Sequence, residues 1–337
     1  MVSPELAESF QRLRELVERK QRFVLSGHQN IDGDSLGSMV AFFAYLRRLG
    51  KQVTAFSLEP ISNRYDFVDL AREVRVFDAE EHAQLVQSAD VFMAFDLCTP
   101  ARLGRIPEFF ADHHPAQVYV DHHPLDGPRP GHLNVMDATQ FASGKIVYDY
   151  LKFVGAPLDA SMALGLLTAI LTDTGWFRYS NTSAETFRVV HELEPHSKVR
   201  LHELYRAIYQ RNEINYLRML GSVVAGARVE LGGRVLWSTI PLCMVKDLGL
   251  VPGWETDAIL DVMRSGDGVE AVALFRELPD GRIRVNLRSR GVADVNLVAR
   301  GLGGGGHRHA AGATIDGPLE RESRRVVQSL VNSLEAT

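Results

Sequence analysis

The sequence predicts an α/β protein in which a parallel-sheet domain is joined by a helical linker to a smaller α/β domain. Short apolar segments alternate with helical patterns from Phe23 to Leu171, which is typical of βαβ units around a parallel sheet. Strand patterns return only after a charged helical stretch. A length of 337 residues suits about two domains.

The first element is an amphipathic helix. Ser3 and Pro4 have the chemistry of a helix N-terminus. Apolar residues then recur at helical spacing: Leu6, Phe10, Leu13 and Val17. A polar, glycine-containing turn at 27–33 separates the first strand from the next helix. The predicted strands are 23–25, 52–56, 74–77, 91–95 and 117–120, and the predicted helices are 34–49, 79–87, 143–153 and 161–171.

The second half begins with a charged helical stretch, from His191 to about Leu220, which we interpret as a connector. Strand patterns follow at 234–240, 269–276 and 282–287. Asp280 and Gly281, between the last two, are typical of a hairpin turn. We therefore expect a first domain over 1–190, a helical linker over 191–225 and a second domain over 226–337.

Charge limits the class of partner. The chain has 37 basic and 42 acidic residues, a net charge of −5, with 45% hydrophobic and 23% charged residues. Proteins that bind long nucleic acids gain affinity by releasing phosphate counterions, which favours an excess of basic residues. The balance argues against a long nucleic acid as partner but not against a small phosphate ligand held locally.

Cysteines and hydropathy indicate the compartment. Cys98 and Cys243 are the only cysteines and lie far apart, so the sequence offers neither a disulfide framework nor a cysteine zinc site. The longest apolar run, Met162–Leu171, is shorter than the roughly 20 residues that span a bilayer. We expect a soluble cytoplasmic protein without a membrane partner, and apolar helix faces favour a homodimer.

The first cluster of chemical interest lies between the first strand and the following helix. His28, Asp32 and Asp34 occur within seven positions, and Gly33 is expected to let the chain turn between the two carboxylates. Ligands of open α/β sheets bind outside the carboxyl ends of the strands. Imidazole with carboxylates suits manganese, iron or zinc. The alternative is a polar turn in which Asp34 or Ser35 caps the helix.

Two more carboxylates fall at comparable positions. Asp96 follows the strand 91–95, and Asp173 ends an apolar helix that offers no partner for a charge. Such a carboxylate needs a cation or a hydrogen-bond network. Taken alone, each has an ordinary interpretation as a loop, cap or turn residue.

The tetrapeptide Asp-His-His-Pro occurs twice, at 112–115 and at 121–124. The second copy directly follows a predicted strand, so Asp121, His122 and His123 should reach the carboxyl edge of the sheet. The first copy precedes that strand, and we interpret it as a surface segment at the opposite edge.

Considered together, these residues predict a two-metal site. The set contains only His and Asp side chains and suffices for two divalent ions that share a carboxylate: His28, Asp32, Asp34, Asp96, His122 and Asp173. Paired ions are the standard means of in-line attack on phosphorus, because they activate water and neutralise charge. No serine or cysteine nucleophile is then required.

A glycine run near the C-terminus predicts an anion site. Gly303–Gly306 exposes backbone N–H groups, with His307 and Arg308 beside it. The stretch 276–308 holds seven arginines against three acids. The alternative is a flexible loop. Strand alternation places Arg282, Arg284 and Arg288 on one face with Asn286.

These motifs resemble those of the DHH phosphoesterase superfamily, specifically its short members with a DHH-associated C-terminal domain. Those members include nanoRNase/pAp phosphatases and cyclic-dinucleotide phosphodiesterases. The resemblance runs from His28 to Gly312, with the motifs in the family's order. Ile31 is one departure, since many relatives have proline there.

The resemblance implies two manganese ions between a DHH catalytic domain and a substrate-binding domain, with Mg2+ or Co2+ as substitutes. One ion would be bound by His28, Asp32 and Asp96, and the other by Asp34, Asp96, His122 and Asp173. His123 would face the substrate phosphate, and Asp121 would support the histidines. The second domain would hold the terminal phosphate or base through Arg288, Gly304, Gly305, Gly306 and His307.

The expected function is hydrolysis of short oligonucleotides and of linear dinucleotides such as pApA to mononucleotides. Removal of the 3′-phosphate of pAp and opening of cyclic di-AMP remain alternatives, because all these ligands present an adenosine phosphate. Inorganic pyrophosphatase, a long-strand exonuclease and a non-catalytic nucleotide-binding regulator fit the sequence less well.

Overall fold

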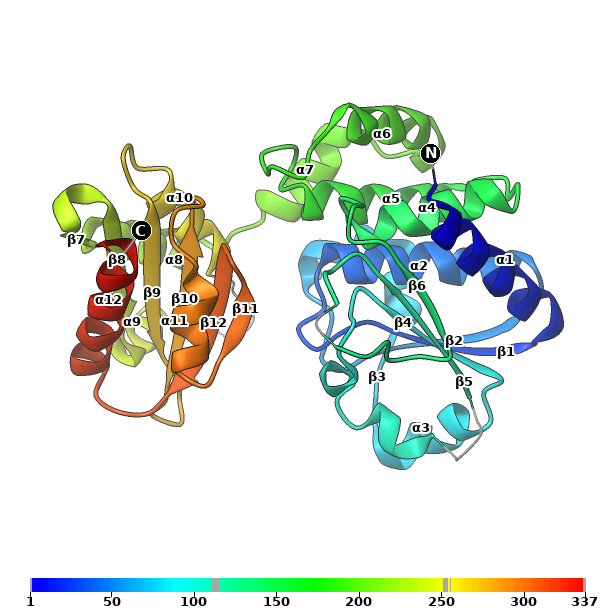
Figure 1. The fold of residues 1–337 in the computed structure, drawn as a ribbon, viewed down its shortest axis with the longest axis horizontal. Coiled ribbons are helices and arrows are strands. Elements are labelled where there is room, and N and C mark those ends of the chain that lie inside the picture. The colour runs from blue at the N-terminus through cyan, green and yellow to red at the C-terminus, as the bar shows by residue number, and fades with distance from the viewer. Residues whose placement is uncertain (1, 111–114, 126, 251–253, 255, 336–337) are drawn as a thin grey trace. The chain divides into compact units, whose positions relative to one another are not determined.

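The computed structural model describes residues 2–110, 115–125, 127–250, 254 and 256–335, and the side chain of His307 lies outside the described part. The chain forms two compact units, Met1–Arg211 and Asn212–Thr337 (Figure 1). Both are α/β, as the sequence predicts. None of the described helices combines the length and apolar character that crossing a bilayer requires.

The first unit contains a six-stranded parallel sheet in the order β3-β2-β1-β4-β5-β6. The strands are β1 (Arg22–Ser26), β2 (Gln52–Ser57), β3 (Arg75–Val76), β4 (Val91–Phe95), β5 (Ala116–Asp121) and β6 (Leu133–Met136). Five of them lie where the sequence predicts strands, whereas β6 was not predicted. The strand order reverses between β1 and β4, and such a switch point is where open α/β sheets bind ligands.

Helices cover both faces of this sheet. One face carries the larger apolar core, and α3 (Ala79–Gln87) covers the other (Figure 1). The helices on the larger core are α1 (Pro4–Arg19), α2 (Gly33–Arg48), α4 (Ser143–Phe153), α5 (Ala160–Asp173) and α6 (Ala184–Ser197), with α7 (Leu201–Tyr209) following. Short 3₁₀ turns are η1 (Asn63–Tyr65), η2 (Asp69–Glu73), η3 (Pro100–Leu103) and η4 (Ile106–Phe109).

The first helix follows the prediction. Ser3 caps it by accepting a hydrogen bond from the Leu6 amide, and Pro4 occupies its first turn. Its buried residues are the predicted stripe: Leu6, Phe10, Leu13 and Val17.

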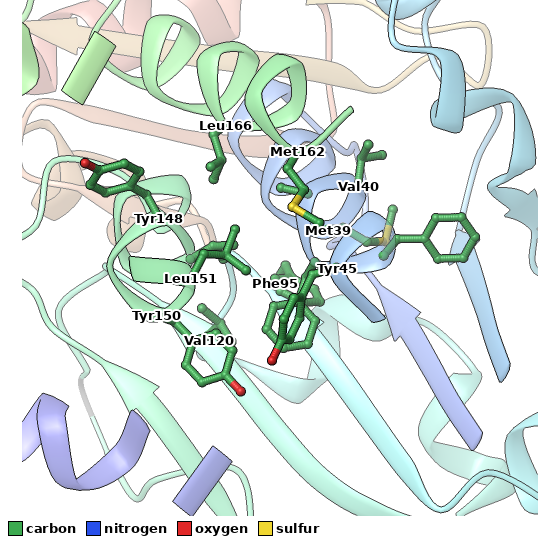
Figure 2. Packing of buried hydrophobic residues seen from close by; sticks show 14 of the residues in the cluster. Met39, Val40, Tyr45, Phe95, Val120, Tyr148, Tyr150, Leu151, Met162 and Leu166 are labelled. Carbon is green, nitrogen blue, oxygen red and sulfur yellow. The ribbon is translucent and has the colours of Figure 1, made fainter. Parts of the chain in front are cut away.

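Helix α5 lies at the centre of the larger core. Residues 162–171 are all buried, so the apolar run that ends at Leu171 is a core helix. Met162 and Leu166 of α5 pack among side chains of α2 and α4, such as Met39 and Leu151 (Figure 2).

Glycines allow α2 and α5 to approach closely. A Cβ on Gly37 would lie 2.3 Å from the Gly165 carbonyl oxygen and 2.7 Å from the Ala169 amide nitrogen. These are backbone atoms, which cannot move aside without shifting a helix. The contact fixes the two helices whose ends carry Asp34 and Asp173.

The second unit contains a mixed six-stranded sheet in the order β11-β12-β10-β9-β8-β7. Among its described strands, β8 and β9 pair in parallel and the other neighbours are antiparallel. The strands are β7 (Arg228–Glu230), β8 (Val235–Ile240), β9 (Ala271–Glu277), β10 (Ile283–Ser289), β11 (Gly305–His307) and β12 (Ala310–Ile315). The predicted hairpin at Asp280–Gly281 joins β9 to β10. The helices are α8 (Ile214–Ala225), α9 (Leu242–Asp247), α10 (Asp257–Arg264), α11 (Val295–Gly301) and α12 (Leu319–Glu335), with a 3₁₀ turn η5 (Leu231–Gly233).

The two faces of this sheet have separate cores. Helices α11 and α12 cover one face, and α8 and α10 cover the other. The helices of the expected connector, 191–225, are therefore shared: α6 and α7 pack in the first unit, and α8 packs in the second.

Gly37→Ala should lower the free energy of unfolding by about 1–3 kcal/mol, because the new methyl group would overpack the helix contact. Gly221→Ala in α8 is the control, since a Cβ there meets no atom within 4 Å. Urea unfolding followed by circular dichroism measures both. A Gly37→Ala variant as stable as the wild type would contradict the close packing of α2 and α5.

Candidate metal centre

The strand ends at the switch point place the predicted ligands together. His28 follows β1, Asp96 follows β4 and His122 follows β5, while Asp173 is the last residue of α5. The ligand atoms fall into three groups in which all lie within 4.8 Å of one another. The groups are His28/Asp32/Asp96, Asp34/His122/Asp173 and Asp96/His122/His123.

The first group is built around His28. Its Nε2 lies 3.6 Å from Asp32 Oδ2 and 3.5 Å from Asp96 Oδ2. Its Nδ1 lies 2.8 Å from the Gln29 carbonyl oxygen. A carbonyl oxygen only accepts, so Nδ1 carries a hydrogen and Nε2 is the nitrogen that faces the carboxylates.

The second group has the same design around His122. Its Nε2 lies 3.7 Å from one oxygen of each of three carboxylates: Asp34, Asp96 and Asp173. Its Nδ1 donates to the Gln140 carbonyl oxygen at 3.2 Å. The buried Nε2 has no hydrogen-bond partner among the described residues, although carboxylates surround it.

Asp96 faces both histidines and belongs to two of the three groups, His28/Asp32/Asp96 and Asp96/His122/His123. Its Oδ2 faces His28 and its Oδ1 faces His122, which is the arrangement of a bridging carboxylate. Its backbone is left-handed, with φ at 63°, while its amide donates to the Val120 carbonyl oxygen at 2.8 Å. A non-glycine residue in this conformation stores roughly 1–3 kcal/mol of strain, and such strain is commonest at functional sites.

Burial and mutual repulsion make it unfavourable for all the carboxylates of the site to be ionised. Asp34 and Asp96 are almost completely buried, at 1% and 2% exposed. Burial raises the pKa of Asp34, and burial together with the Asp34 and Asp32 charges raises the pKa of Asp96 and of Asp173 well above the usual range. Burial lowers the pKa of His28, but the Asp32 and Asp96 carboxylates outweigh it and raise the pKa to about 10.

Divalent cations fit this donor set. Two ligand atoms held about 2.1 Å from one ion stand roughly 3.0–3.6 Å apart. The distances from the imidazole Nε2 atoms to the carboxylate oxygens, 3.5–3.7 Å, are close to this range. A cation would also offset the repulsion between the buried carboxylates and give His122 Nε2 a partner. Mixed imidazole and carboxylate donors suit Mn2+ or Zn2+ better than Ca2+.

The N-terminus of α4 orients two of the carboxylates. The Ser143 and Gly144 amides donate to Asp34 at 2.7 and 2.9 Å, and the Ser143 hydroxyl donates to Asp96 at 3.0 Å. Sequence reasoning missed both residues. The available signal was their position at the start of a predicted helix, where the amides have no partner within the helix.

His123 differs from the other two histidines because its Nδ1 contacts a carboxylate. Nδ1 lies 2.7 Å from Asp121 Oδ1, which also accepts the His123 amide at 3.2 Å. Burial lowers the pKa of His123, but the Asp121 and Asp96 carboxylates raise it above its ordinary value. Asp121 is completely buried and therefore holds the imidazole in a fixed position.

Two local expectations need correction. The helix cap is Asp32, which accepts the Ser35 amide at 3.0 Å, rather than Asp34 or Ser35. Gly33 lies within the first turn of α2 rather than in a turn before it, and a Cβ there would collide with the Thr172 side chain at 2.4–2.8 Å. Close approach to α5 therefore explains this glycine. The first Asp-His-His copy, at 112–114, lies outside the described residues.

The predicted anion residues of the second unit lie on its sheet. Gly305–His307 forms the edge strand β11 rather than a loop, because Gly304 and Gly306 let it approach β12. Arg288 donates to Asp257 at 2.6 Å and to the Leu287 carbonyl oxygen at 3.0 Å. The side chain of His307 lies outside the described part.

Comparisons with known proteins show which families the chain resembles. The sequence matches the DHH family, N-terminal domain, over residues 22–170 and the DHHA1 domain over 250–335. It is 31% identical to the bifunctional oligoribonuclease and PAP phosphatase NrnA of Thermus thermophilus, covering 92% of this chain and 89% of that one. Identity to the Bacillus subtilis protein of the same name is 26%, covering 87% and 88%.

A solved structure has the same fold. An exopolyphosphatase-related protein from Bacteroides fragilis superposes with a TM-score of 0.90 at 20% identity, covering 96% of each chain. At this identity, the likeness concerns the fold alone.

Asp96→Asn should weaken Mn2+ binding in both groups by roughly 100-fold or more, because the variant lacks the charge that they share. Calorimetric titration with Mn2+ measures this directly. Asp159→Asn is the control, since Asp159 only caps α5 and asparagine caps equally well. Loss of one Mn2+ equivalent with the other unchanged would contradict a bridging role for Asp96.

Proposed function

The chain belongs to the DHH family and is a phosphoesterase, and from this premise we propose that it is a manganese-dependent phosphodiesterase of short oligonucleotides. Its substrates would be oligonucleotides of a few residues and linear dinucleotides such as pApA, and its products would be mononucleotides.

The proposal rests on one observation: the two oxygens of a single carboxylate face two different histidines. Asp96 joins the His28 and His122 groups in this way. Two divalent cations in such a site supply an activated water and neutralise the phosphoryl oxygens. The ligands proposed for them are His28, Asp32 and Asp96 on one side, and Asp34, Asp96, His122 and Asp173 on the other.

The chain's own groups would complete the chemistry. Gln29 and Gln140 fix the imidazoles of His28 and His122, the two proposed metal ligands, through their carbonyl oxygens. Asp121 holds His123, which would interact with the phosphate or donate a proton to the leaving oxygen. In the second unit, Arg288, His307 and the segment Gly304–Gly306 remain the proposed substrate-binding residues.

Charge supports a short substrate. Binding of a long strand draws its affinity from many phosphate contacts. A chain with a net charge of −5 is poorly suited to that, whereas a few local cationic groups suffice for a nucleotide or dinucleotide.

A second activity is supported by the names of the relatives. The Thermus thermophilus and Bacillus subtilis proteins are each named as both an oligoribonuclease and a PAP phosphatase. We therefore propose removal of the 3′-phosphate of pAp at the same centre.

A side-by-side turnover assay with Mn2+ tests the substrate. The panel is pApA, an RNA pentamer, pAp, cyclic di-AMP and pyrophosphate, and we expect the highest kcat/KM for pApA or the pentamer. A clear preference for cyclic di-AMP or pyrophosphate would contradict the proposed substrate while leaving the metal centre intact.

His123→Asn should lower kcat by roughly 10²–10⁴-fold while Mn2+ binding is unchanged, because His123 is proposed to act on substrate. His132→Asn is the control, since His132 is exposed and its ring accepts the Gln117 amide on the surface of the first unit. Loss of Mn2+ together with activity would instead make His123 a metal ligand, and an unchanged kcat would remove it from the mechanism.

A further inference from the structure

Two arginines of the second unit lie side by side on its sheet. Arg276 of β9 and Arg284 of β10 are direct partners in the antiparallel register. Like charges opposite each other destabilise a strand pair. The pair therefore needs a compensating group.

Arg276 is the more buried member of the arginine pair. It is half-buried, and its buried Nε has no hydrogen-bond partner among the described residues. Its guanidinium lies 4.9 Å from the centre of the Trp254 ring. Burial and the neighbouring Arg284 charge lower the pKa of Arg276. A buried donor without an acceptor calls for an explanation, such as a bound ligand.

Carboxylates do not neutralise the pair. Within the described residues, neither Arg276 nor Arg284 forms an ion pair. Other arginines in or beside the strands of the same sheet do pair with carboxylates: Arg228, Arg234, Arg282 and Arg288. Described carboxylates thus pair with other arginines of this sheet but not with Arg276 or Arg284.

A glycine on the neighbouring strand leaves room for the Arg284 guanidinium. Gly312 of β12 lies beside it, and a Cβ there would stand 3.2 Å from Arg284 Nη2. Without a side chain at 312, the exposed guanidinium can lie along the strand. Asn286, two residues further on the same face, donates to Thr256 Oγ1 at 3.0 Å.

We propose that Arg276 and Arg284, beside Trp254, bind a phosphate group of a nucleotide. Paired guanidiniums match the charge and the bidentate geometry of phosphate better than those of a single carboxylate. An indole ring at the same place suits a nucleotide, since every base has a face that stacks on aromatic rings.

The arginine pair is distinct from Arg288, although Gly312 beside Arg284 pairs with Gly305 of the proposed glycine segment. Arg284 and Arg288 are four residues apart on one strand, about 13 Å along it. Arg288 is also held by Asp257. The phosphate would come either from a further nucleotide of the oligonucleotide substrate or from a free nucleotide. The choice of a nucleotide as ligand rests on the proposed function.

Arg284→Ala tests the site, because Arg284 is exposed and its loss should not disturb folding. The control is Arg282→Ala. This variant loses the same positive charge, but Arg282 lies two residues from Arg284 and already pairs with Asp280. Calorimetry would measure binding of 5′-phosphorylated adenosine pentanucleotide, AMP, inorganic phosphate and adenosine. Excess EDTA prevents turnover, so a failure of the proposed oligonucleotide hydrolysis would not affect the result.

Arg284→Ala should weaken binding of phosphorylated ligands about ten-fold, and Arg282→Ala less than two-fold. Weakening confined to the pentanucleotide would support a further substrate phosphate as the ligand, and weakening of AMP or phosphate as well would support a free nucleotide. The proposal is overturned if Arg284→Ala binds every phosphate as the wild type does, if adenosine binding falls equally, or if the wild type binds none of these phosphates.

Discussion

The repulsion between buried carboxylates is the constraint on which the first unit depends. Asp34 and Asp96 lose nearly all contact with water, and Asp173 lies in one group with Asp34. Burial without compensation is expensive for an ionised group. The chain offsets part of the cost with the Ser143 and Gly144 amides and with two imidazoles. The remainder is what a divalent cation would relieve, so the same arrangement that weakens the isolated protein would favour binding of a cation.

The packing of the helices serves this arrangement. Asp34 comes from the first turn of α2 and Asp173 from the last residue of α5, so their separation depends on how closely the two helices cross. Gly37 and Gly165 allow backbone to meet backbone at that crossing. Gly33 lets α2 approach Thr172, next to Asp173 itself. Small residues thus control the distance between ligands that lie far apart in the sequence.

Sequence reasoning predicted the candidate site residues that follow parallel strands. Side chains that follow β1, β4 and β5 must meet at one sheet edge, and the structure brings His28, Asp96 and His122 together there. It missed β6, because this strand has only four residues and includes Asn134, a poor strand former that α1 helps to hold through Ser9. It also missed Ser143 and Gly144, since they act largely through backbone amides, which residue types do not reveal. The partner of Arg276 likewise depends on a strand register that alternation alone cannot give.

Each unit holds a cluster of like charges, which is negative in the first unit and positive in the second. In the first, carboxylates gather without enough cationic partners. In the second, Arg276 and Arg284 face each other, and no carboxylate of the described residues pairs with them. A net charge of −5 conceals both clusters, because it sums charges of both signs over the whole chain. Like charges that a fold holds together at a cost to its own stability bind ligands of opposite charge without further reorganisation. Local imbalance of charge, rather than total charge, therefore supports the proposed cation site in one unit and the proposed phosphate site in the other.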